Sequence, residues 1–163
     1  MSTGDPHGPA AEGVSVALAA VVGTVCFGAL AILGLGMLSY FTDTDIISVE
    51  GLQLWPGVIG MVAAIAAYAA LLTSLLRRRR PAFGSVLLIA VVTVIAHLVA
   101  VWISALLGGA GFAHATAAIS QLVLHGSSLV VLAAGLIAGW IAVALRRARS
   151  GVPKWPWERG EDV

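Results

Sequence analysis

Two histidines are the residues of this sequence best placed to do chemistry. His97 and His125 lie within residues 81–145, a tract of 65 residues that has no charged side chain. Each is 14 residues from Gly111, where glycines cluster and the tract is expected to turn. In a hairpin of two helices the imidazoles would therefore lie at nearly the same depth. Neutral imidazoles at one depth can ligate a haem iron from both sides or bind copper.

The same two side chains have two simpler interpretations. Each imidazole can hydrogen-bond to a neighbouring helix, through Thr93, Gln121 or Ser128, because polar side chains inside a membrane find partners across helix interfaces. A histidine pair can also relay protons. We favour hydrogen bonding, so no cofactor and no metal are expected. Haem or copper bound by His97 and His125 is the alternative.

The rest of the sequence excludes several other kinds of chemistry. Lys and Arg number 9 and Asp and Glu number 8, and the resulting net charge of +1 is too small for a surface that binds nucleic acid. The single cysteine, Cys26, cannot form an internal disulfide or a dithiol redox pair. The sequence has no phosphate-binding loop, no zinc-spaced cluster and no recognisable pair of nucleophile and base. We therefore expect no enzymatic activity.

Long uncharged stretches determine the expected architecture. Of the 163 residues 60% are hydrophobic and 10% are charged, against about 25% charged in a soluble domain. The uncharged stretches cover residues 13–42, 51–76 and 81–145, and about 20 helical residues cross a bilayer core. The third stretch is long enough for two spans. We expect an all-α integral membrane protein with one domain over residues 14–145, a four-transmembrane-helix antiparallel bundle with helices at about 14–38, 55–76, 83–107 and 115–145.

Basic residues are confined to two places, which sets the expected orientation. They lie between the second and third expected helices and after the fourth, at Arg77, Arg78, Arg79, Arg80, Arg146, Arg147 and Arg149, with Lys154 and Arg159 further along. The loop between the first and second helices carries only acidic charges. The positive-inside rule then places both termini in the cytoplasm, with the arginines near lipid headgroups of a bacterial plasma (inner) membrane.

The two ends of the chain are expected to lie outside the membrane domain. Residues 1–13 contain two prolines and three glycines and predict a disordered tail. Residues 146–163 predict a basic cytoplasmic tail, and its Trp155 and Trp157 are suited to the headgroup region.

Small residues at four-residue spacing predict how the helices pack. Helices in a membrane associate through close backbone approach at small side chains. The third expected helix carries such a series at Ala96, Ala100 and Ser104, and the fourth carries Gly135 and Gly139. These faces predict contacts within the bundle, and the glycine pair is equally compatible with a homodimer interface.

The expected function follows from this inventory. No acidic or basic residue lies inside a predicted span, and intramembrane ionisable groups are the usual mark of transport or catalysis. We expect a non-enzymatic accessory or scaffold subunit whose partners are the lipid bilayer and another membrane protein or a second copy. One alternative is a haem- or copper-binding electron-transfer protein that uses His97 and His125. Another is an oligomeric small transporter or channel.

Overall fold

The computed structural model describes residues 14–43, 55–78 and 82–147, and every regular element within them is an α-helix. The helices are α1 (Val16–Thr42), α2 (Trp55–Leu76), α3 (Gly84–Leu107), α4 (Gly111–Leu124) and α5 (Ser127–Arg147). Helices α1, α2, α3 and α5 are long and apolar enough to cross a membrane, whereas α4 has only 14 residues. The all-helical class and the four long apolar helices are thus confirmed. The expected tail 1–13, and all of the expected C-terminal tail beyond residue 147, lie outside the described residues.

Local sequence explains where several helices begin and end. The side chain of Ser15 accepts a hydrogen bond from the backbone N–H of Leu18 (3.2 Å) and so caps α1. α1 continues to Thr42, beyond the expected end near residue 38. Pro56 lies in the first turn of α2, where its missing N–H breaks no helical hydrogen bond. α3 ends before Gly109, which has a φ of 83° and turns the chain.

The helix expected over residues 115–145 is two helices in the structure. α4 already begins at Gly111 and ends at Leu124. Gly126 then has a φ of 83°, which glycine adopts at little cost, and α5 begins at the next residue. At 1.5 Å per residue α4 is about 21 Å long, short of a bilayer core of about 30 Å. The fourth helix of membrane-crossing length is therefore α5 alone.

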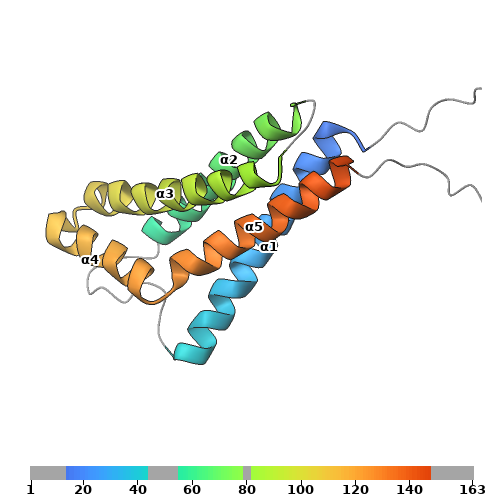
Figure 1. Ribbon diagram of the computed structural model, residues 1–163. Coiled ribbons are helices and arrows are strands. Elements are labelled where there is room, and N and C mark those ends of the chain that lie inside the picture. The colour runs from blue at the N-terminus through green and yellow to red at the C-terminus, as the bar shows by residue number, and fades with distance from the viewer. Residues whose placement is uncertain (1–13, 44–54, 79–81, 148–163) are drawn as a thin grey trace, which may run out of the picture.

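The long helices form two neighbouring pairs. Figure 1 shows α1 beside α5 and α2 beside α3, with α4 joining the end of α3 to the start of α5. A Cβ built on Gly23 of α1 would lie 2.9 Å from the Cβ of Ala142, and one built on Gly34 would meet Val130. Residue numbers therefore rise along α1 while they fall along the contacting face of α5. In α4, Phe112 makes an edge-on ring contact with Trp102 of α3 (5.8 Å between centroids).

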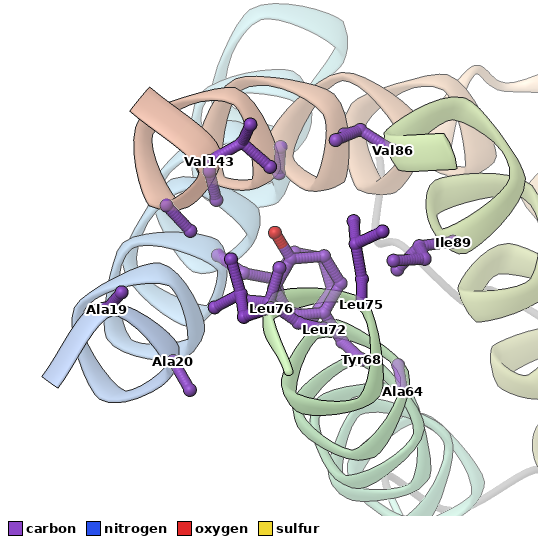
Figure 2. Close-up of a cluster of buried hydrophobic side chains, with 14 of the residues drawn as sticks. Ala19, Ala20, Ala64, Tyr68, Leu72, Leu75, Leu76, Val86, Ile89 and Val143 are labelled. Carbon is purple, nitrogen blue, oxygen red and sulfur yellow. The ribbon is translucent and has the colours of Figure 1, made fainter. Parts of the chain in front are cut away.

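The core lies where α1, α2, α3 and α5 meet. Figure 2 shows Tyr68 rising from α2 into this region, with Leu72 and Leu76 beside it and Val86 and Val143 on the facing helices. All five side chains are at most 1% exposed, as close packing of a protein interior requires.

The outward faces of the long helices are apolar as well. Each of the four long helices carries large hydrophobic side chains with more than half of their surface exposed, for example Val25 (65%), Val62 (62%), Leu88 (66%) and Leu129 (66%). A monomeric soluble protein rarely exposes contiguous apolar surface on this scale. Helices that are apolar on every side suit insertion into a membrane.

Candidate functional site

The candidate site is a buried polar pair on α3, Thr93 and His97. Thr93 is fully buried and His97 is 5% exposed, and the two lie one helical turn apart. A Cβ built on Gly60 of α2 would lie 3.1 Å from both Nδ1 and Cε1 of the imidazole and would also meet Val101. The imidazole therefore rests directly on the backbone of α2, at a position that only glycine leaves open.

Both polar side chains hold an atom without a partner among the described residues. The hydroxyl oxygen of Thr93 makes no hydrogen bond there, and Nδ1 of His97 makes none of ordinary geometry, although the backbone of Gly60 lies beside the imidazole. Buried polar groups normally have a partner, and leaving one unpaired costs about 1–3 kcal/mol. The pair can donate and accept hydrogen bonds at the interface of α2 and α3, but it supplies a single imidazole for a metal. Among the described residues no group of three or more His, Cys, Asp or Glu side chains is placed to hold a metal ion.

The second expected imidazole lies in different surroundings. His125 is the C-cap of α4, and its backbone N–H donates to the carbonyl oxygen of Gln121 (2.8 Å). Its side chain is exposed, whereas that of His97 is buried. The equal depth inferred from the sequence rested on an antiparallel hairpin that is helical from Ala115 to His125, and it stays a prediction. What the structure shows is that His97 is enclosed while His125 is left on the surface.

Tyr68 is a polar residue of α2 that contacts two other helices, and no role was predicted for it from the sequence. Its hydroxyl donates to the carbonyl oxygen of Gly135 on α5 (3.1 Å), and its ring stacks on Phe27 of α1 (4.4 Å between centroids). One side chain of α2 thus contacts both α1 and α5. Figure 2 shows the hydroxyl oxygen of Tyr68, in red, pointing toward α5. The available signal was a single polar aromatic residue within an alanine-rich span.

The glycine pair of α5 lies against α3 of the same chain. A Cβ built on Gly135 would lie 3.2 Å from the Cβ of Ala90, and one built on Gly139 would meet Val86. Both glycines are buried. These contacts lie within one chain, and the packing role of the two glycines and the alternative of a homodimer interface both stay predictions.

The small residues expected on α3 lie beside its buried face. Ala96, Ala100 and Ser104 are each half-buried, and the hydroxyl of Ser104 donates to the Val101 carbonyl of its own helix (2.9 Å). The face that α3 buries instead follows Ile89, Ala90, Thr93, His97, Val101 and Ala105. The role of the three small residues in packing stays a prediction.

The described arginines lie directly after α2 and in the last turn of α5. Arg146 donates to the backbone carbonyl of Val14 (3.0 Å), so the end of α5 lies beside the start of α1. The guanidinium of Arg147 lies over the ring of Phe83 (4.6 Å to the centroid), beside the start of α3. Arg77 and Arg78 are exposed after α2. Three further arginines of the expected set lie outside the described residues, namely Arg79, Arg80 and Arg149.

Over the described residues this is a small all-helical protein with four helices long and apolar enough to cross a membrane, which contact one another through a tyrosine, glycines and a buried histidine. The chain belongs to a family of unknown function, DUF6121, whose model matches residues 14–163. No curated protein and no solved structure matches the chain.

Proposed function

We propose that this chain is an integral protein of a bacterial plasma membrane that acts as a non-enzymatic accessory or scaffold subunit. The observation that supports this proposal is that one set of side chains packs the helices against one another while another set faces outward. Tyr68, Gly135 and Gly139 make contacts between helices of the same chain, while the outward faces of the long helices are apolar. Such a bundle is held together from within and offers its outer faces to lipid and to partner helices.

The proposed topology is four antiparallel spans, α1, α2, α3 and α5, with both termini in the cytoplasm. Contacts at the ends of the helices support it, because Arg146 meets the start of α1 and Arg147 meets the start of α3. The arginines that follow α2 and α5 are then at one end of the bundle, and the positive-inside rule assigns that end to the cytoplasm. Asp43, at the opposite end of α1, would face outward.

Reporter fusions test the topology. An alkaline phosphatase and green fluorescent protein pair fused after residue 147 and within residues 44–54 should be fluorescent at the first site and phosphatase-active at the second. A fusion near Gly109, between α3 and α4, should also be phosphatase-active. The reverse pattern would overturn the orientation.

Affinity purification from native membranes in mild detergent tests the accessory role. A tagged chain should recover one membrane protein in fixed stoichiometry, and the reciprocal purification should recover this chain. Deleting the gene should lower the amount of that partner in the membrane. An unrelated four-span protein with the same tag is the control. Repeated recovery of this chain alone would contradict the proposal.

An absorption spectrum of the purified protein tests the alternative of a haem or copper protein. A haem band or stoichiometric copper that disappears when His97→Ala and His125→Ala are combined would replace the accessory role with electron transfer.

A further inference from the structure

Helix α4 carries an apolar stripe and a polar stripe, each at spacings of seven and four residues, which keep side chains on one face of a helix. The apolar stripe consists of Phe112, Ile119 and Val123. The polar stripe consists of His114, Gln121 and His125. The first and last residues of each stripe are exposed, and the middle residues are half-buried. Both stripes are therefore accessible at the surface of the bundle.

The two stripes lie on opposite sides of α4. Each polar residue comes two positions after an apolar one, and two residues correspond to about 200° around a helix of 3.6 residues per turn. A third face, formed by Ala115, Ala118 and Leu122, is buried. Helix α4 thus turns one face to the bundle and has an apolar face on one side of it and a polar face on the other.

A ring contact shows which of the two exposed faces points toward the middle of the bundle. The ring of Phe112 lies edge-on against Trp102 of α3, with 5.8 Å between the centroids. Trp102 comes five residues before Leu107, the last residue of α3, which is about 7.5 Å at 1.5 Å per residue. The apolar stripe therefore begins with a ring that lies inside the end of α3.

Short connections hold α4 at this end of the bundle. Residues 108–110 join it to α3 and residues 125 and 126 join it to α5, as Figure 1 shows. Its 14 residues are too few to cross a bilayer core of about 30 Å. Residues 81–145 have no charged side chain, so α4 has no charge of its own that could attract lipid headgroups. The apolar stripe is the feature of α4 that suits a membrane boundary.

The neighbouring helix ends indicate what covers the apolar stripe. Leu107, at the end of α3, is 84% exposed, and Leu129, in the first turn of α5, is 66% exposed. In a membrane the acyl chains around these two side chains also adjoin α4, because α4 is joined directly to both helices. Lipid is therefore the occupant closest to the apolar stripe.

We propose that α4 is an interfacial helix that binds the membrane surface at the end of the bundle opposite the arginines, with its apolar stripe among the acyl chains and its polar stripe in water. The proposal rests on the membrane location proposed above and adds to the four spans a helix that crosses nothing. Amphipathic helices at such a boundary bury their apolar face about 5–10 Å deep. Trp102, which contacts the apolar stripe, is suited to the same layer.

The accessibility of spin labels tests the position of α4. Val123→Cys and His125→Cys are made separately in the full-length protein with Cys26→Ala, and each variant is labelled with a nitroxide and reconstituted in phosphatidylcholine vesicles. Oxygen concentrates among acyl chains, whereas a nickel chelate stays in water. We expect the ratio of oxygen to nickel accessibility to be about threefold or more higher for Val123→Cys than for His125→Cys, because the two faces lie on opposite sides of the boundary. Val62→Cys, at a position 62% exposed within α2, is the reference for a span and should give a higher ratio than either.

Charge variants, read at the label on Val123→Cys, test whether the apolar stripe holds α4 in place. Phe112→Asp puts a carboxylate on the apolar stripe and should raise nickel accessibility at residue 123 about threefold or more, because a charge is costly among acyl chains. His114→Asp puts the same charge on the polar stripe and should change it by less than about 1.5-fold. Phe112→Ala also loses the ring contact with Trp102 but adds no charge, and it should stay within about 1.5-fold as well. Circular dichroism and gel filtration verify that each variant is folded.

The outcomes that overturn the proposal are distinct. Equally high ratios for Val123→Cys and His125→Cys would place all of α4 inside the bilayer, and equally low ratios would place all of it in water. Nickel accessibility of Val62→Cys as well would contradict the membrane location itself. Low accessibility of Val123→Cys to both reagents would mean that protein covers the apolar stripe, and spin–spin broadening of that label would identify the cover as a second copy of the chain.

Discussion

His97 and His125 are the same residue type in the same uncharged tract, yet the structure treats them differently. His97 is enclosed between α3 and α2, where its imidazole lies on the backbone of Gly60. His125 is exposed at the end of α4, one residue before the turn at Gly126. The position of a residue within an uncharged tract therefore does not determine its burial, because burial depends on which face of the helix contacts a neighbouring helix.

The stability of the two regions is also expected to depend on different physical features. Around His97, side chains and backbone fill the space between two helices, so volume should decide stability. Around Gly126 nothing lies within 4 Å of an added Cβ, so backbone conformation alone should decide it. Substitutions in the two regions test this difference when the free energy of unfolding is measured by titration with sodium dodecyl sulfate in mixed micelles.

The largest effect is expected for Gly60→Leu. The new side chain would collide with Val101 and the imidazole of His97, and overpacking of this kind costs about 3 kcal/mol. Gly36→Leu is the control, since an added Cβ there meets nothing within 4 Å. Similar stability of the two variants would mean that α2 and α3 do not pack as described.

The histidines themselves come next. His97→Ala should lower the free energy of unfolding by about 2 kcal/mol, because it leaves a cavity between two helices. His125→Ala should change it by less than about 0.5 kcal/mol, as is usual at exposed positions. Equal losses in both variants, with a double variant no worse than either single one, would instead indicate that the histidines act as a pair.

A smaller effect is expected at the junction of α4 and α5. Gly126→Ala should cost about 1 kcal/mol, because a φ of 83° is unfavourable for a residue with a Cβ. Gly36→Ala, at an exposed helical position of α1, should be neutral or stabilising by up to about 1 kcal/mol. Stabilisation by Gly126→Ala would show that residues 115–145 form the continuous helix expected from the sequence.

The smallest effect is expected for Tyr68→Phe. It removes the hydrogen bond to Gly135 while it keeps the ring on Phe27, and hydrogen bonds between membrane helices contribute about 0.6 kcal/mol on average. Tyr40→Phe, at a residue 80% exposed on α1, should have no measurable effect. A loss above about 2 kcal/mol for Tyr68→Phe would mean that the hydroxyl has a further role.

The positions of α2 and α3 could be predicted closely from the sequence. The expected helix over 55–76 matches α2, and the one over 83–107 differs from α3 by one residue. The break at Gly126 was missed because a single glycine within an apolar tract is tolerated in a helix, so it gives no clear signal. The cluster at Gly108, Gly109 and Gly111 was recognised as a turn because several glycines occur together.

The candidate site was predicted only in part. His97 was identified as an intramembrane polar residue that faces a neighbouring helix, and it is buried against α2. Its expected partner, His125, is exposed, and the role of Tyr68 in joining three helices was not foreseen. The series Ala96, Ala100 and Ser104 is half-buried, although its spacing looked as suitable for packing as that of the buried face.

The number of long apolar helices could be predicted from the sequence, because charged side chains are too costly inside a bilayer and the uncharged stretches between them are long enough for four spans. Which face of each helix is buried could not be predicted from the sequence and follows from how the helices pack. The physical reason is that helices apolar on every side carry no amphipathic pattern, so the contacts at Gly60, Tyr68 and Gly139 are selected by shape and by single hydrogen bonds.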